Sequence, residues 1–491
     1  MTEFILLPKD GIRGSEAQRS VLSGLPRTRS VNTPIATTLE SVSGQPSMNV
    51  VDSIKEDGPM LVEMAENTAN DINSDTQSPV RAVQVVYYDR PNPQVAIANV
   101  VASAGATTNV SCVDSTTGAG VPGASVVAFT DFDEKEGASG KTDNNGDVFL
   151  GINSPTIERL YVYPPSGYWG GYQENLATGN TISVQLEPVD LAYKDCIRHY
   201  YGNSNFDSSV GVKVGIIDSG VGPHTDLNLD VPNCRNTVTG EPGNAYEDGG
   251  DHGTHVAGIV GSHGIAGSAL RGVAHGVELV ALRVFPSGGK ASNYAILKAM
   301  IFAADAGCDI INLSLGGGPA DAIVREAMDD AQHQGMLVIA ASGNDGRAPV
   351  AFPAAYSKSI AVSALGVDGT FPPGSLEAGD VLRPPVSAAN PTEFIASFSN
   401  IGIEINCTGP GVGALSTLPN NGFGPMSGTS MAAPAVAGAA ACLLSQNTNI
   451  YNMPRDAARA EALRNLLLNN CDKRGFGGQF EGIGLPDPAL V

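Results

Sequence analysis

The C-terminal part of this 491-residue chain predicts an α/β fold, in which a parallel sheet carries helices on both faces. Two observations lead to this fold class. From about residue 190 onward, strand-like apolar runs alternate with helical runs, which is the order of βαβ units. The strand-like runs are apolar throughout rather than at every second position, so both faces of the sheet are predicted to be buried. In chain order the runs are "VKVGIID", "HVAGIVGS", "VELVALRVF", "NYAILKAMIFAADAG", "DIINLSL", "DAIVREAMDDAQHQG", "MLVIAAS" and "SIAVSAL".

Residues 1–95 predict a small α+β unit that ends in a linker. The chain opens with the strand-like "EFILLP" and then passes through a polar stretch rich in Ser, Thr and Pro. A helical segment is expected near residues 60–74, followed by a strand over residues 80–88. "DRPNP" at 89–93 then breaks any regular element.

Residues 96–189 predict a small β-sandwich, because short alternating segments such as "TISVQLEP" are separated by turn residues. This pattern of short strands and turns resembles the carboxypeptidase-regulatory-like and Cna-B-like sandwich domains. "DNNGD" at 143–147 allows a calcium loop or a hairpin turn. The turn is favoured, because the glutamate that occupies position twelve of an EF-hand loop is missing.

The charge and hydropathy of the sequence argue against some classes of binding partner. The balance of 28 Lys and Arg against 50 Asp and Glu gives a net charge of −22. Nucleic acid and anionic membranes both require a basic face, so this excess argues against either as a partner. No apolar run approaches the length of a membrane span, and the start lacks the regions of a signal peptide. We therefore expect a cytoplasmic or non-classically exported chain.

The seven cysteines are odd in number and form no Cys-x-x-Cys pair. Neither a zinc ribbon nor a full disulfide framework is therefore expected.

Three separated residues are candidates for a hydroxyl nucleophile and for the two groups that activate it. Asp218 follows the first apolar strand of the sheet, at the edge where ligands collect in such folds. His252 opens the helical "HGTHVAG". Ser430 follows a glycine turn at the start of the long Ala-rich helix, beside free backbone N–H groups that favour negative charge. The plain alternatives are a turn residue for Asp218 and a helix N-cap for Ser430.

His252 and His255 are three positions apart, a spacing that could also ligate zinc. No H-E-x-x-H motif and no third ligand accompany them. We therefore expect one imidazole to be catalytic and the other to pack against the sheet. His252 lies nearer the loop and is the better base.

Together, the carboxylate, the imidazole and the hydroxyl supply the groups of a catalytic triad. Asp218 would fix the tautomer of His252 and stabilise its cation. His252 would take the proton of Ser430 and return it to the leaving amine.

Over roughly residues 205–491, the chain resembles the subtilisin-like serine peptidases, or subtilases. Four separated motifs agree in order: "VGIIDSGVGPHTDL", "HGTHVAG", "AASGNDG" and "GTSMAAPAVAG". The resemblance implies a doubly wound parallel sheet for residues 190–491 and serine endopeptidase activity. It also implies that Asn344 is the side-chain donor of the oxyanion hole, with the Ser430 backbone N–H as the second donor. An α/β-hydrolase is disfavoured, because its G-x-S-x-G elbow and its Ser, acid, His order are not found.

The resemblance extends to the substrate. "NLSLGGG" at 312–318 resembles the strand that lines the primary specificity pocket, where an extended substrate adds as a further strand. No acidic residue lies in this stretch, so an apolar side chain at the cleaved position is favoured over Arg or Lys. The expected substrate-binding residues are Ser314, Leu315, Gly316 and Gly317.

Two further features concern a metal and access to the cleft. No cofactor is needed for the chemistry. Asp226 matches a position that the family often uses for structural calcium, although the usual ligand loop is not recognisable. A Pro-rich stretch at about 369–393 looks inserted and is expected to be a surface loop.

Residues 1–95 precede the peptidase part of the chain, which is the position of the inhibitory propeptides in this family. We therefore expect a self-processed zymogen whose own N-terminal segment is an intramolecular inhibitor, with its tail in the substrate cleft as an added strand. A cut near 88–97, which leaves the sandwich on the mature enzyme, is favoured over a cut near 190.

Two other functions stay open at this point. One is a catalytically silent, peptidase-like binding protein. The other is an adhesion or docking module carried by the β-sandwich. No member of the triad and no oxyanion donor is replaced, and this favours the active enzyme.

Overall fold

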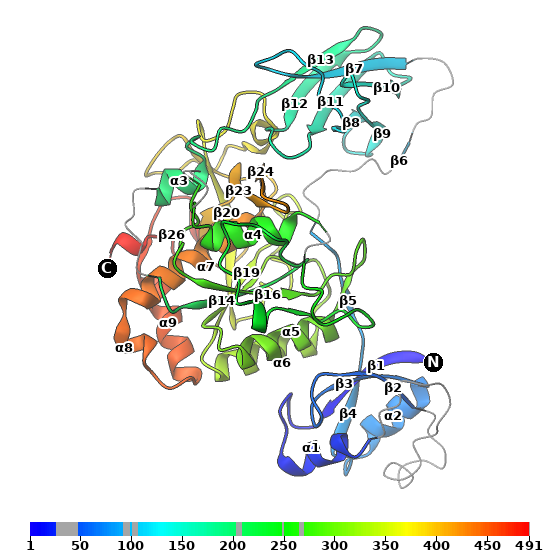
Figure 1. The fold of residues 1–491 in the computed structure, drawn as a ribbon, viewed down its shortest axis with the longest axis vertical. Coiled ribbons are helices and arrows are strands. Elements are labelled where there is room, and N and C mark those ends of the chain that lie inside the picture. Colours follow the sequence, from blue (N-terminus) through cyan, green and yellow to red (C-terminus); the bar gives the residue numbers. More distant parts are fainter. Residues whose placement is uncertain are drawn as a thin grey trace.

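The computed structural model describes residues 1–25, 48–91, 99–100, 107–202, 209–247, 250–264 and 270–490. Figure 1 shows three bodies along the long axis of the molecule: a small N-terminal unit at one end, a large α/β body in the middle and a β-structure at the other end. Within these described ranges, no helix is both long and apolar enough to cross a lipid bilayer.

The parallel sheet that the sequence predicts is confirmed in the central body. Five strands run parallel to their neighbours in the order β16, β14, β18, β19 and β20. The first of them along the chain, β14, lies inside the sheet, and later strands add on both of its sides, which makes the sheet doubly wound. The strands are β14 (Lys213–Asp218), β16 (Glu278–Arg283), β18 (Ile310–Leu313), β19 (Leu337–Ala341) and β20 (Ser359–Val367); further strands at the margins are β15 (Arg235–Asn236), β21 (Glu393–Ile395) and β22 (Ile405–Pro410).

Helices cover both faces of this sheet (Figure 1), as the uninterrupted apolar strands require. Alternate residues of the strands face two separate hydrophobic cores, one shared with α4, α7 and α9 and the other with α5 and α6. The helices are α4 (His252–Gly261), α5 (Asn293–Asp305), α6 (Ala322–His333), α7 (Thr429–Gln446) and α9 (Ala457–Asn469).

The N-terminal unit is a four-stranded antiparallel sheet with two helices. The expectation of a helix near residues 60–74 is wrong for its first part, because Met60–Met64 forms a buried strand between two neighbours and only Glu66–Ser74 is helical. Pairing with the first strand therefore prevails over the local preference of this short segment. The elements are β1 (Thr2–Pro8), α1 (Glu16–Ser23), β2 (Asn49–Ser53), β3 (Met60–Met64), α2 (Glu66–Ser74) and β4 (Val80–Gln84).

The single strand expected over residues 80–88 is divided in two. β4 completes the N-terminal sheet, whereas β5 (Tyr87–Tyr88) leaves that sheet and pairs antiparallel with β17 (Ala291–Ser292) of the α/β body. The end of the N-terminal unit is thus strand-paired to the body. The interrupting "DRPNP" lies only partly within the described residues, which stop at 91 and resume at 99.

Residues 107–186 form two sheets that share one hydrophobic core, which is a β-sandwich. "DNNGD" is a turn, but it connects β9 to β10 across the two sheets and not within a hairpin. One sheet contains β10 (Asp147–Gly151), β7 (Thr107–Asp114) and β13 (Ile182–Leu186); the other contains β12 (Gly171–Ala177), β11 (Thr156–Tyr163), β8 (Ser125–Asp131), β9 (Glu136–Lys141) and β6 (Asn99–Val100).

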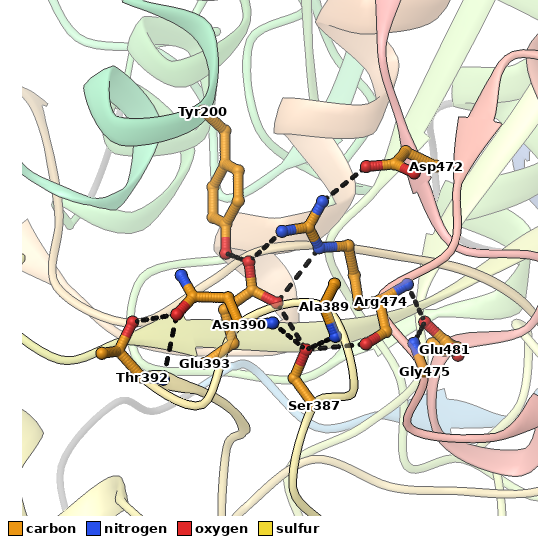
Figure 2. A network of polar contacts seen from close by, with 10 residues as sticks. All are labelled: Tyr200, Ser387, Ala389, Asn390, Thr392, Glu393, Asp472, Arg474, Gly475 and Glu481. Carbon is orange, nitrogen blue, oxygen red and sulfur yellow. Dashed lines mark hydrogen bonds and ion pairs between the residues drawn. The ribbon is translucent and has the colours of Figure 1, made fainter.

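The inserted stretch at about 369–393 lies at the surface, with Leu382 and Val386 exposed, and is anchored to the body by buried residues. Figure 2 shows that the buried Glu393, at the end of this stretch, accepts hydrogen bonds from Tyr200 Oη at 2.9 Å and Ser387 Oγ at 3.0 Å and pairs with the Arg474 guanidinium. A buried carboxylate requires such partners. The network joins the insertion to α3 (Cys196–Tyr201) and to the C-terminal segment.

Candidate active site

Asp218 is the last residue of β14 and is fully buried. Its Oδ1 accepts hydrogen bonds from the backbone N–H of Ser219 at 2.6 Å and from Nδ1 of His252 at 2.8 Å. The carboxylate therefore holds the imidazole in one orientation and selects the tautomer with the proton on Nδ1.

The two histidines of α4 lie in different environments. His252 is the first residue of the helix and faces Asp218. His255 Nε2 lies 3.0 Å from the Ala414 carbonyl oxygen and 3.1 Å from that of Gly424. Complete burial lowers the pKa of His255 to about 3, so this imidazole is neutral and serves packing. Because the two rings have separate partners, they do not form a shared metal site.

Ser430 is the second residue of α7, so its backbone N–H has no partner within the helix. Its hydroxyl donates to the Ser314 carbonyl oxygen at 3.4 Å, and within the described residues it makes no hydrogen bond with His252. Ser314 in turn donates its hydroxyl to the Ser430 carbonyl oxygen at 2.8 Å and accepts from Asn312 at 2.9 Å. The predicted substrate strand is therefore hydrogen-bonded to the nucleophile candidate.

Asn344 follows β19 and lies beside the turn that precedes Ser430. Its Oδ1 accepts hydrogen bonds from the backbone N–H and from the hydroxyl of Thr429, both at 2.9 Å. These bonds use the oxygen of the amide, and the Nδ2 donor lies 3.4 Å from the position that a Cβ on Gly428 would take. The role of Thr429 was missed, although the residue lies inside the quoted "GTSMAAPAVAG".

A strand of the same chain lies beside the predicted substrate strand. Tyr88 in β5 is completely buried, and its ring lies against Gly318, where a Cβ atom would meet it at 2.5 Å. The preceding Val86 carbonyl accepts from the Asn293 N–H at 2.8 Å. Two residues beyond Tyr88, the Arg90 guanidinium lies against Gly250, close in sequence to His252. The segment thus crosses the α/β body toward the Asp218 and His252 pair.

Of the predicted substrate residues, Ser314 and Leu315 are buried, and Gly317 donates its N–H to the Phe352 carbonyl oxygen at 3.2 Å. Gly316 lies near the same carbonyl. This stretch therefore packs against the segment around Phe352, and Tyr88 covers its far end.

Asp226, the candidate calcium ligand, is buried, and its backbone carbonyl accepts from the His263 N–H at 2.8 Å. Among the described residues, no group of three or more His, Cys, Asp or Glu side chains could hold a metal ion. The side chains near Asp226 therefore add nothing to the expectation of calcium, which stays a prediction.

The buried Asp218 and His252 pair, with Ser430 at a neighbouring helix start, invites comparison with known proteins. The model of the subtilase family matches residues 209–485. The chain belongs to the subtilase family. It is a subtilisin-like serine endopeptidase, as its motifs predicted, and residues 1–208 lie outside the matched part.

Curated relatives agree with this assignment. Subtilisin Savinase of Lederbergia lenta is 34% identical over 275 residues, which are 56% of this chain and 88% of that protein. Subtilisin DY of Bacillus licheniformis is 38% identical over 240 residues, 48% of this chain and 77% of that protein. Alkaline elastase YaB of Bacillus sp. (strain YaB) is 34% identical over 278 residues, 57% of this chain and 64% of that protein. The cytoplasmic location considered from the sequence gains no support from these relatives.

Proposed function

We propose that this subtilase cleaves polypeptides with Ser430 as nucleophile, His252 as general base and Asp218 as the group that orients the base. The observation that carries the proposal is the hydrogen bond of 2.8 Å between His252 Nδ1 and the buried Asp218, at the same edge of the sheet as Ser430. Peptide-bond cleavage requires an imidazole whose second nitrogen can accept a proton, and a hydrogen bond from Nδ1 to Asp218 leaves Nε2 for that role.

The proton follows a closed path in this mechanism. His252 Nε2 takes the proton of the Ser430 hydroxyl as Oγ attacks the carbonyl carbon of the substrate. The imidazolium, stabilised by Asp218, then gives that proton to the nitrogen of the leaving amine, and a water molecule repeats the sequence to release the acyl group. Rotation of Ser430 away from the Ser314 carbonyl would bring the hydroxyl to His252, a contact that often forms only with substrate bound.

The developing oxyanion would be held by two donors. The Ser430 N–H lies at the positive end of α7, and Asn344 Nδ2 is oriented because its Oδ1 is fixed by Thr429. Such preorganised donors act mainly on the transition state, where the negative charge appears.

An extended substrate would add along the stretch that contains Ser314, Leu315, Gly316 and Gly317. Apolar or small side chains surround this stretch, so an apolar side chain at the cleaved position is favoured. No cofactor takes part in the chemistry, and Asp226 would serve a structural calcium ion only.

We further infer that the chain is a zymogen of three parts: an inhibitory unit in residues 1–95, a β-sandwich in 96–189 and the peptidase in 190–491. The pairing of β5 with β17 and the burial of Tyr88 support an intramolecular inhibitor, because a strand in this place excludes an extended substrate. The favoured cut near 88–97 falls largely on residues outside the described ranges.

A serine-directed sulfonyl fluoride tests the active enzyme against the catalytically silent alternative. Purified protein should be modified at Ser430 and should hydrolyse a peptide substrate, whereas Ser430→Ala should do neither. Ser445→Ala, at the far end of the same helix, is the matched control and should behave as wild type. Folded protein that is neither labelled nor active would establish the silent binding protein instead.

A further inference from the structure

The largest side chain of the β-sandwich, that of Trp169, is buried outside the hydrophobic core of the sandwich. Trp169, the only tryptophan of the chain, lies in the loop between β11 and β12 and is 1% exposed. It belongs to the hydrophobic core of the peptidase and not to that of the sandwich. Its ring makes an edge contact with Tyr193 at 5.3 Å between centroids and lies 3.3 Å from the position of a Cβ on Gly413. If the sandwich were joined to the peptidase only by a linker, its tryptophan would not be expected in the core of the peptidase.

Backbone hydrogen bonds continue this contact on both sides of Trp169. The Gly167 N–H donates to the Phe423 carbonyl oxygen at 3.1 Å, in β24 (Gly422–Met426). On the other side, the Leu376 N–H of the insertion donates to the Gly170 carbonyl oxygen at 3.1 Å. The loop is thus fixed to two segments of the peptidase, β24 and the insertion.

The insertion connects Trp169 with the turn that precedes Ser430. Glu377 of the insertion is buried, and its Cγ would lie 3.1 Å from a Cβ on Gly413, on the same glycine that faces Trp169. Ser427 lies between them: its hydroxyl accepts from the Gly413 N–H at 3.0 Å and donates to Glu377 at 3.5 Å. Ser427 stands three residues before Ser430, and the Gly428 N–H that follows is held by the Gly411 carbonyl oxygen at 2.8 Å.

The electrostatics agree with a dry, closed contact. Burial raises the pKa of the Glu377 carboxyl, and burial together with the nearby Glu377 raises the pKa of Asp380 well above its usual range. The Glu377 carboxyl is kept out of water here beside Asp380, with Ser427 as its hydrogen-bond partner. Removing the sandwich would open this site to solvent.

From this chain of contacts, we propose that the β-sandwich is retained in the active enzyme and positions its nucleophile: Trp169 and Glu377 act through Gly413 and Ser427 to fix the turn that carries Ser430. The proposal rests on the proposed role of Ser430 as nucleophile. It assigns Trp169 and Glu377 as positioning residues, which do not touch substrate, and it distinguishes the sandwich from a detachable docking module.

Steady-state kinetics on the mature enzyme, produced from the full chain, test the proposal. Trp169→Ala should lower kcat by about 10- to 100-fold, the range expected when a reacting group is misplaced by a fraction of an ångström, with KM changed little. Trp169→Phe should recover most of the loss. Glu377→Ala should lower kcat in the same way, and Glu377→Gln, which keeps the acceptor oxygen for Ser427, should restore it. Phe149→Ala, at a 68% exposed site elsewhere on the sandwich, is the matched control and should not differ from wild type.

Several outcomes would overturn the proposal. A wild-type kcat in folded Trp169→Ala would show that the sandwich is a passenger. If that variant fails to fold, the two variants Glu377→Ala and Glu377→Gln provide the test. A wild-type kcat in Glu377→Ala, with an unchanged melting temperature, would contradict a positioning role for Glu377. Mass spectrometry of the protein labelled by the sulfonyl fluoride gives a second readout, and an active species that begins after residue 189 would show that the sandwich is dispensable. If wild-type Ser430 is not labelled at all, the proposed nucleophile is wrong, and that result is distinct from an effect of Trp169.

Discussion

At the scale of single residues, the site depends on which atom of each side chain is left free. Asp218 binds one nitrogen of His252 and leaves the other available, while Thr429 binds the oxygen of Asn344 and leaves its nitrogen available. Both arrangements prepare a group before substrate arrives. Preorganisation of this kind is what separates a catalytic donor from a turn residue, the plain alternative for Asn344.

Asn344→Ala should lower kcat by about 10²–10³-fold, the loss known for removal of the side-chain oxyanion donor from a subtilisin, and should change KM little. The reason is that the oxyanion exists in the transition state and not in the bound substrate. Steady-state kinetics on a peptide substrate measure this, with the exposed Asn452→Ala as control. A loss confined to KM would mark Asn344 as a structural residue.

His255 should make the fold sensitive to acid. The folded pKa is lowered to about 3, while the unfolded chain has the ordinary value of about 6.5, so acid protonates the unfolded chain first. The stabilisation is complete above pH 6.5 and is lost as the pH falls toward 3, which amounts to about 3 kcal/mol at pH 4.

Urea unfolding from pH 7 to pH 4 in the inactive Ser430→Ala background measures this loss. His255→Gln should flatten the pH dependence by that amount, because the amide cannot gain a proton. The exposed His333→Gln should leave the pH dependence unchanged. An equally steep profile in His255→Gln would mean that other groups cause the acid sensitivity.

At the scale of elements, β5 is the strand that we propose blocks an extended substrate. Tyr88→Ala in the isolated N-terminal segment should weaken its inhibition of the mature enzyme by about 30-fold or more, because a buried aromatic anchor contributes about 2 kcal/mol or more to an interface. The neighbouring Tyr87 is 49% exposed, so Tyr87→Ala is the matched control. Inhibition constants for the three segments measure the effect, and equal values for all three would show that β5 is not the inhibitory strand.

The elements also show what the sequence could and could not predict. Long apolar runs such as those of β14 and α7 predicted the α/β body well, because burial on both faces of a sheet leaves a clear pattern. Met60–Met64 was misassigned as helix, and Tyr87–Tyr88, correctly expected to be a strand, was not expected to leave the N-terminal sheet, because each short segment pairs with a strand distant in the chain. Asp218, His252 and Ser430 could be proposed because fixed motifs surround them. Trp169 and Glu377 stand in no motif, and only the folded structure brings them to Ser427.

At the scale of the whole molecule, the two added parts contact the peptidase at different places and in different ways. The sandwich shares core with the peptidase through Trp169. The N-terminal unit also shares core with the peptidase, through Ile5, Leu7, Ile12, Ile54 and Leu61, and adds the pairing of β5 and ion pairs such as Arg13 with Asp330 at 2.6 Å. Of the two added parts, the N-terminal unit is the one that places a strand, β5, where an extended substrate would add, so its release is what would free the enzyme.

Maturation should therefore remove the N-terminal unit and keep the sandwich. Wild-type protein should be cut within residues 88–97, whereas Ser430→Ala should accumulate at full length, since without the hydroxyl nucleophile the chain cannot hydrolyse its own linker. Intact mass and N-terminal sequencing of both proteins measure this, and Ser445→Ala should be processed like wild type. Adding a trace of mature enzyme to Ser430→Ala then shows whether the linker can also be cut between molecules. Wild-type protein that stays intact and fully active, or Ser430→Ala that is cut without added enzyme, would show that residues 1–95 are not a self-removed inhibitor.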